Sequence, residues 1–290
     1  MEEAIETLKL SDLDFPAELK TIPQPPKVIY TRGRLKKETR VAIVGTRLCS
    51  DYGKLVAANI AQELVEAGIV IVSGLTPGID TIAHKTAVEN KARTIAVLGT
   101  GLDKRSIYPQ TNVVLAENIL ENDGLLISEY PPGMHGARYS FPQRNRIIAG
   151  LSLAVVVIEA KEKSGSLITA GWALKQGKLI FAIPGSVYSA NSQGCHQLIK
   201  KGAILARNAK DILDGIGIDS QQSLGIKTGF EGSEEEILIF KSLREGALDV
   251  DKIILTTGLP AKKVLSLLPI LEIKGKIRDL GENIYALNHC

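Results

Sequence analysis

The stretch RVAIVGTRLCSDYGKLVAANIAQELVEAGIVIVSG, residues 40–74, decides the fold class. It contains two short runs of apolar, largely β-branched residues, VAIVG (41–45) and IVIVSG (69–74). Between them, VAANIAQELVEAG (56–68) carries apolar residues at helical spacing. Near-continuous apolar runs are typical of strands that are covered on both faces. The stretch therefore predicts two parallel strands joined by a helix in a right-handed crossover.

Four further apolar runs of the same kind follow along the chain. They are TIAVLG (94–99), LLISE (125–129), LAVVVIEA (153–160) and LIFAIPG (179–185). Repeated alternation of strands and helices is typical of α/β proteins with a parallel sheet. We therefore predict an extended Rossmann-like parallel sheet over residues 40–212.

Composition divides the rest of the chain into three smaller segments. Residues 1–39 contain several prolines and end in a basic stretch. Because proline lacks a backbone donor and disfavours helix in the residue before it, we expect an extended N-terminal arm here. Residues 213–232 carry few large apolar side chains and are expected to form a linker. Residues 233–290 show three helical patterns and a short hairpin, which predicts a winged-helix-like domain.

The predicted winged-helix domain is slightly acidic. Residues 231–290 hold 8 Lys and Arg residues against 10 Asp and Glu residues. Affinity for duplex DNA depends largely on neutralising phosphates, so this domain is expected to bind a duplex poorly on its own. We interpret it as a protein-contact or regulatory unit.

The overall composition sets limits on the class of protein. The chain has 290 residues, 44% of them hydrophobic, and a net charge of +3, a value that neither requires nor excludes nucleic acid. Cys49, Cys195 and Cys290 are too far apart in sequence for a disulfide framework or a CxxC metal site. No signal peptide is recognisable, and no apolar run approaches the roughly 18 residues that span a bilayer. We expect a cytoplasmic protein without membrane, metal or cofactor.

Loops rich in Gly, Ser and Thr follow four of the predicted strands. They cover residues 45–47, 73–80, 99–101 and 164–169. Ligands of open parallel sheets collect beyond the carboxyl ends of the strands, where helix N-termini point their amide groups outward. Glycine lets the backbone approach an anion closely, so these loops predict a shared phosphate-binding edge. Tight strand-to-helix turns also use glycine for geometry alone, and this remains the alternative.

The sequence favours a single nucleic-acid strand over a mononucleotide. It has no GxxxxGK[ST] loop, and the first turn, GTRLCS, is not GxGxxG. Instead, the acid-free segment between Glu129 and Glu159 interleaves arginines with aromatic residues: Arg138, Arg144 and Arg146 with Tyr130, Tyr139 and Phe141. Aromatic rings stack on unpaired bases while arginines bind the backbone. The alternative is that the rings are core residues and the arginines pair with acids.

At this point the chain resembles a known family. GTR (45–47), SGLTPGID (73–80), FPQRNRIIAGLS (141–152) and KSGSLITA (163–170) occur in the order seen in the DprA/Smf family of DNA-processing proteins. The likeness runs from about residue 16 to residue 212. It implies a homodimer that binds and protects single-stranded DNA taken up in natural transformation. It also implies that the protein helps to load the RecA recombinase onto that DNA.

The resemblance assigns roles to individual residues. By position, Arg47 corresponds to the main DNA-contacting arginine of the family, Arg138 to a basic residue beside it, and Phe141 to an aromatic residue near the bases. Together with the loops, this gives the expected DNA-binding residues: Gly45, Thr46, Arg47, Ser73, Gly74, Gly78, Arg138, Phe141, Arg144, Asn145, Arg146, Ser164, Gly165, Ser166 and Thr169.

An enzyme on the same fold is the alternative. Asp80, Glu129 and Glu159 fall near strand ends, where carboxylates can bind a metal or transfer protons. Acids at helix starts also cap amides and pair with arginines, and no nucleophile–base pair is recognisable. His84 lies within a predicted helix and is interpreted as a packed residue. We therefore expect a protein that is not an enzyme; a nucleotide-processing, phosphoribohydrolase-like enzyme would be expected to carry a PGGxGT-like loop, which is absent here.

Overall fold

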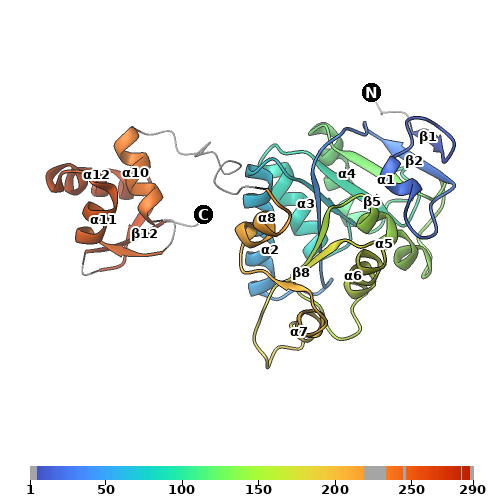
Figure 1. Ribbon diagram of the computed structural model, residues 1–290. Helices are drawn as coiled ribbons and strands as arrows, with labels where there is room; N and C mark the ends of the chain where they lie inside the picture. Colours follow the sequence, from blue (N-terminus) through green and yellow to red (C-terminus); the bar gives the residue numbers. More distant parts are fainter. Residues whose placement is uncertain (1–4, 219–232, 244–245, 282, 288–290) are drawn as a thin grey trace. The chain divides into compact units, whose positions relative to one another are not determined.

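The computed structural model describes residues 5–218, 233–243, 246–281 and 283–287 (Figure 1). The chain forms two compact units, Met1–Gly225 and Ile226–Cys290. The first unit is an α/β domain and the second is a small winged helix. Each is described separately below.

A sheet of nine strands, counted over the described residues, forms the centre of the first unit. Its order is β1-β2-β6-β5-β4-β3-β7-β8-β9. The strands from β6 to β9 run parallel, as predicted. They are β3 (Arg40–Val44), β4 (Val70–Ser73), β5 (Thr94–Leu98), β6 (Leu125–Ser128), β7 (Ala154–Val157), β8 (Leu179–Ala182) and β9 (Ile204–Leu205). Each of the six apolar runs thus contains one strand, and the two-residue β9 is an addition that no apolar run indicated.

The N-terminal segment contributes to this sheet. β1 (Glu6–Lys9) pairs antiparallel with β2 (Val28–Arg32), and β2 pairs antiparallel with β6. The short helix α1 (Ala17–Lys20) lies between the two strands, and its Leu19 is buried in the core. Residues 6–32, expected as an arm leading into the fold, are instead built into the α/β unit, because β2 completes the backbone hydrogen bonds of β6.

Helices cover both faces of the sheet (Figure 1). On one face α2 (Asp51–Glu66), α3 (Ile79–Glu89) and α8 (Ala209–Gly215) share a core with the odd-numbered residues of β3, and α4 (Val113–Glu121) packs beside α3. On the other face α5 (Ser140–Gly150), α6 (Gly165–Lys175) and α7 (Gln193–Lys200) pack with α1 on the even-numbered residues. This burial on both faces explains why the strands are apolar throughout.

The strand order reverses between β3 and β7. From β3 the chain proceeds through β4 and β5 to β6, and it then returns to place β7 on the other side of β3. Val44 pairs with Val157, so the two strands end side by side. After β3 the chain enters α2 on one face of the sheet, and after β7 it enters α6 on the other face. This divergence opens a crevice at the switch point, the usual ligand position in such sheets.

The second unit has the predicted order of a winged helix. It contains α10 (Glu234–Ser242), β10 (Leu248–Asp249), α11 (Val250–Thr257), α12 (Ala261–Ile273), β11 (Ile277–Asp279) and β12 (Ile284–Leu287). Ile239, Ile253, Leu268 and Ile277 belong to its core. At the start of α10, the hydroxyl of Ser233 accepts a bond from the backbone N–H of Glu236, and the Glu236 carboxylate accepts one from that of Ser233, forming a capping box.

Two further sequence expectations concern the linker and the absence of a membrane-spanning helix. The predicted linker, residues 213–232, begins within α8, and most of it lies outside the described residues. Among the described residues, no single helix is long and apolar enough to cross a membrane; α11 and α12 meet such a test only together, as a pair bent by 114°.

Gly78 offers a test of the loop geometry at the switch point. Its φ and ψ angles of 83° and −129° disfavour any L side chain, and an added Cβ would lie 2.3 Å from the Thr46 carbonyl oxygen. Gly78→Ala should lower the free energy of unfolding by more than about 2 kcal/mol. Urea unfolding followed by the fluorescence of Trp172, the single tryptophan, measures this change.

Gly171→Ala is the matched control. Gly171 lies within α6 with open space around its Cα, so alanine should leave stability unchanged or raise it by up to about 1 kcal/mol. Equal effects of the two substitutions would contradict the assigned strain at Gly78.

Candidate nucleic-acid interface

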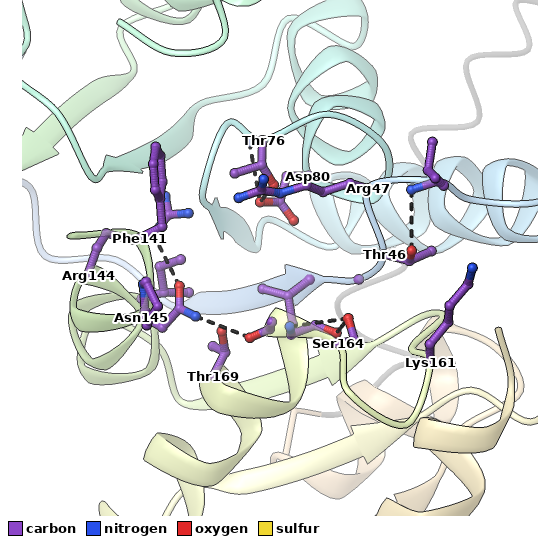
Figure 2. Close-up of a pocket in the computed structure, with 17 residues that line it drawn as sticks. Thr46, Arg47, Thr76, Asp80, Phe141, Arg144, Asn145, Lys161, Ser164 and Thr169 are labelled. Carbon is purple, nitrogen blue, oxygen red and sulfur yellow. Dashed lines mark hydrogen bonds between the residues drawn. The ribbon is translucent and has the colours of Figure 1, made fainter. Parts of the chain in front are cut away.

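A pocket of about 410 Å³ occupies the switch point (Figure 2). The residues that line it come from the ends of β3 and β7, from the loop before α3 and from the starts of α5 and α6. They are Val44, Gly45, Thr46, Arg47, Leu48, Thr76, Asp80, Phe141, Pro142, Arg144, Asn145, Ile148, Lys161, Ser164, Gly165, Ser166 and Thr169. Ten of the fifteen predicted DNA-binding residues are among them. We call this cavity the switch-point pocket.

The first wall of the pocket is the turn after β3. The backbone N–H of Thr46 donates to the Glu159 carbonyl oxygen (2.8 Å), and the Thr46 carbonyl accepts from the backbone N–H of Ile79 (3.3 Å). A Cβ on Gly45 would meet the Ile79 side chain at 2.4 Å, so only glycine allows this close packing. The turn is therefore fixed between β7 and α3, and Arg47 follows it directly. Figure 2 shows Arg47 extending toward Phe141.

The opposite wall is the start of α6. Ser164 caps this helix by accepting a hydrogen bond from the backbone N–H of Ser166 (3.4 Å), and the two hydroxyls lie 2.8 Å apart. Asn145 donates to the Gly165 carbonyl oxygen (3.2 Å), which ties α5 to α6. The backbone amides of the first turn carry the positive end of the helix dipole. An anion in the pocket would meet these amides, the serine hydroxyls and the exposed ammonium group of Lys161.

Arg144 holds the inner part of the pocket together. It is almost fully buried, and its guanidinium donates to the carbonyl oxygen of Gly74 (2.7 Å) and to that of Val97. Its Nε donates to Asn145 Oδ1 (3.2 Å). Burial lowers the pKa of Arg144 to about 10, which leaves it charged at neutral pH. A Cβ on Gly74 would meet this guanidinium at 2.5 Å, so the glycine makes room for the arginine.

Asp80 lies near this buried arginine. Its carboxylate accepts a hydrogen bond from the Thr76 hydroxyl (2.7 Å). Burial raises the pKa of the Asp80 carboxyl, while the charge of Arg144 and the hydrogen bonds from Thr76 oppose that rise. We therefore interpret Asp80 as the internal counter-charge of Arg144.

A second pocket of about 420 Å³ adjoins the first. It is lined by Arg47, Tyr108, Gly136, Ala137, Arg138, Phe141 and Pro142, and we call it the aromatic pocket. The guanidinium carbon of Arg47 lies 5.6 Å from the centre of the Phe141 ring, within the range of a cation–π contact. The rings of Phe141 and Tyr108 are 5.5 Å apart and inclined by 57°. Both pockets share Arg47, Phe141 and Pro142, so they form one continuous surface.

The structure does not bring every predicted residue to this surface. Arg146 is 2% exposed; its guanidinium donates to the Glu129 carboxylate (2.6 Å) and to the carbonyl oxygen of Gln24 (2.7 Å). Tyr130 is also buried, and its hydroxyl donates to the Ser140 carbonyl oxygen (3.3 Å). For these two residues the structure supports the alternative, a ring in the core and an arginine paired with an acid.

Three predicted residues of the loop 73–80 also have structural roles instead of lying on this surface. The Ser73 hydroxyl is buried and donates to the Ile43 carbonyl oxygen (2.6 Å), Gly74 accommodates Arg144, and Gly78 provides a positive φ. None of the three lines either pocket. For this loop, geometry explains the glycines better than phosphate binding does.

The carboxylates considered for catalysis are engaged separately. Glu159 accepts hydrogen bonds from the backbone and the hydroxyl of Ser50 (2.9 and 2.6 Å), and Glu129 pairs with Arg146. Within the described ranges, no group of three or more His, Cys, Asp or Glu side chains is placed to bind a metal. His84 is packed in the core, with Nδ1 2.8 Å from the Thr94 hydroxyl oxygen.

Lys161 and Tyr108 line the pockets with side chains suited to nucleic-acid contacts, and neither is among the residues expected from the sequence. Lys161 lines the switch-point pocket, and its position just after β7 at the strand-order reversal was a usable signal. Tyr108 lines the aromatic pocket but comes from the loop after β5, and no spacing in the sequence connects it with Phe141.

Comparison with known proteins assigns the family. Residues 6–217 match the family DNA recombination-mediator protein A, and residues 228–283 match the DprA winged helix domain. The chain belongs to the DprA family. Its relatives include the DNA processing protein DprA of Bacillus subtilis, 42% identical over 73% of this chain and 72% of that protein. The DprA of Streptococcus pneumoniae is 46% identical over 69% of this chain and 70% of that one.

Two solved DprA structures resemble this chain. A crystal structure of Streptococcus pneumoniae DprA has a TM-score of 0.68 at 42% identity and covers 73% of this chain and 75% of its own. A structure of Helicobacter pylori DprA, which concerns the single-stranded DNA binding mode of that protein, has a TM-score of 0.65 at 32% identity. It covers 74% of this chain and 98% of its own.

His84 should make the stability of the α/β unit of this DprA-family protein pH-dependent. Burial lowers its pKa from 6.5 to about 3, so the folded protein keeps His84 neutral while the unfolded chain takes up a proton. The contribution of neutral His84 is complete above pH 6.5 and is lost as the pH falls toward 3. Between pH 7 and pH 4, wild type should lose about 3 kcal/mol more stability than His84→Gln.

Urea unfolding at a series of pH values measures this difference. The carboxyl groups titrate in both proteins, so the comparison isolates His84. His135→Gln removes an exposed histidine and should follow wild type. Parallel pH profiles for wild type and His84→Gln would show that the buried ring does not remain neutral.

Proposed function

We propose that this chain binds single-stranded DNA across the switch-point pocket and the aromatic pocket, and that it does so in the cytoplasm during natural transformation. The observation that carries the proposal is the adjacency of the two cavities. One presents helix-start amides, hydroxyls and a lysine, the other presents aromatic rings and arginines, and Arg47 belongs to both. The described binding of single-stranded DNA by the Helicobacter pylori relative supports it.

The switch-point pocket suits the phosphates of such a strand. The amides at the start of α6 and the side chains of Arg47 and Lys161 all favour an anion. Asp80, the only carboxylate among the described lining residues, lies near the buried Arg144. Contacts of this kind depend on the charge and spacing of the phosphates and not on the identity of the bases. Binding should therefore depend on salt and little on base sequence.

The aromatic pocket suits unpaired bases. Aromatic side chains stack on the faces of bases, and those faces are accessible in a single strand but covered by neighbouring pairs in a duplex. Arg47 and Arg138 line the same pocket, and guanidinium groups beside a stacked base are suited to binding its phosphates. This arrangement favours a single strand over a duplex.

The finer parts of the proposal rest on membership of the family. We propose that the chain protects the incoming strand, helps to load RecA onto it, and acts as a homodimer. The apolar residues Leu174, Leu179 and Ile204, which are exposed and line a cavity of about 390 Å³, support self-association. The acidic winged helix is proposed as a protein-contact or regulatory unit. Measuring the mass of the complexes that the protein forms with oligonucleotides of increasing length tests the stoichiometry.

Arg47→Ala tests the phosphate contact. The substitution removes one cation, so it should weaken binding to all sequences and reduce the slope of log K against log salt by between about 0.7 and 1. Fluorescence anisotropy with a labelled oligonucleotide at several salt concentrations gives both quantities. Lys200→Ala, which changes an exposed lysine on α7 that lines neither pocket, is the control. An unchanged slope for Arg47→Ala would remove Arg47 from the phosphate-binding set.

The same assay separates this function from an enzymatic one. A phosphoribohydrolase-like enzyme on this fold would turn over nucleoside monophosphates, whereas a DNA-binding protein should retain an oligonucleotide and release no product. We expect the protein to retain the oligonucleotide in a salt-sensitive manner. Chromatography of the mixture should show an intact oligonucleotide and unchanged monophosphate. Release of a free base would overturn the assignment as a non-enzymatic DNA-binding protein.

A further inference from the structure

Helix α12 occupies the position of the recognition helix in the winged-helix unit. It follows α11 and precedes the hairpin of β11 and β12. In DNA-binding proteins of the helix-turn-helix class, the second helix of the motif enters the major groove and contacts base edges. The inner side of α12, with Val264, Leu268 and Leu271, packs in the core of the unit. The opposite side is therefore the surface that a partner would meet.

The solvent side of α12 is largely apolar. Leu265 is 56% exposed, Ile270 43% and Ile273 87%, and Pro269 is exposed as well. At 100° per residue, these four side chains fall on the half of the helix that lies opposite its buried residues. Apolar side chains cannot form hydrogen bonds with base edges, and contiguous apolar patches mark sites of protein–protein contact. We call this side of the helix the α12 face.

Two lysines of α12 and its C-terminal cap are already paired with acids of α10. Lys263 Nζ lies 3.0 Å from Glu235 Oε1, and Lys274 Nζ lies 2.8 Å from Glu236 Oε1. Binding of DNA phosphates through these lysines would compete with both ion pairs. The pairing and the apolar surface together suit this helix to a protein partner better than to a duplex.

The two ends of the α12 face carry opposite charges. Lys262 is exposed in the first turn of the helix, and Glu272 is exposed in its last turn. When two copies of α12 lie antiparallel with these faces in contact, Lys262 of each helix comes level with Glu272 of the other, and Leu265 comes level with Ile270. This arrangement is two-fold symmetric, so every contact occurs twice. The face is therefore complementary to itself in both charge and apolar character.

We propose that the α12 face docks antiparallel on the same face of a second copy of this chain. This inference rests on the proposed role of the winged helix in protein contact and deepens it by naming the surface and the partner. One pair of helices buries less surface than a stable interface requires. Two winged helices that belong to one homodimer, however, meet at a much higher effective concentration than those of separate chains. Their contact would strengthen the homodimer proposed above.

Ile273→Glu tests the docking face in the full chain. It places a charge in the apolar contact of both copies, so it should raise the dissociation constant of self-association by about tenfold or more. Sedimentation equilibrium at a series of protein concentrations measures this constant. Leu255→Glu, at a position 81% exposed on the neighbouring α11, is the matched control and should associate like wild type. An unchanged dissociation constant for Ile273→Glu would overturn the docking face.

Charge reversal tests the partner and the antiparallel direction. Lys262→Glu and Glu272→Lys each bring like charges together across the contact, so each should weaken self-association about fivefold. The double variant restores opposite charges and should associate like wild type, which also shows that both substitutions are compatible with the fold. An equal mixture of the two single variants should associate more tightly than either alone. Failure of both the double variant and the mixture to recover would overturn the antiparallel pairing of two copies.

DNA binding by the same proteins separates this inference from the proposed DNA interface. Both pockets of that interface are lined by residues of the α/β unit, so Ile273→Glu should bind a short oligonucleotide like wild type in the anisotropy assay. Absence of oligonucleotide binding by wild type would overturn the proposed DNA-binding function alone. A wild type that stays monomeric at every concentration would overturn the α12 pairing together with the proposed homodimer, while DNA binding would stand.

Discussion

The buried guanidinium of Arg144 is the group on which the site depends. It binds the carbonyl oxygens of Gly74 and Val97 after β4 and within β5, and it lies beside the carboxylate of Asp80. These contacts join the start of α5 to the edge of the sheet where the strands end. A buried charge is costly unless its surroundings compensate it; here the carbonyl oxygens of Gly74 and Val97 accept its hydrogen bonds, and the nearby Asp80 carboxylate favours the charged guanidinium. These contacts fix the position of the segment that carries Phe141.

The rest of the binding surface is positioned, step by step, from Arg144. Arg144 fixes the start of α5, the nearby Phe141 lies under Arg47, and Arg47 extends from a turn clamped between β7 and α3. Cationic groups therefore sit at defined places on rigid elements. In the proposed function this order matters, since a preorganised surface loses less freedom when a flexible strand binds to it.

The sequence predicted the repeated strands of the α/β unit and the winged helix, and it missed the short strands β1, β2 and β9. Six apolar runs located six strands because burial on both faces leaves a continuous signal, whereas β9 is too short to give one. In the site, Arg144 and Arg146 were grouped together although residues two apart on a helix point in nearly opposite directions. That spacing was readable. The meeting of Arg47, Phe141 and Tyr108 was not, because three separate loops bring them together.

Both margins of the sheet are short. β1 has four residues, including Glu6 and Lys9, and β9 has only two. Unpaired edge strands can recruit strands of other chains, and brief or charged edges resist this. Neither edge therefore offers a long unpaired strand on which the sheet could extend from one molecule into another. In a homodimer of the kind proposed above, the two copies would therefore meet through side chains rather than through one continuous sheet.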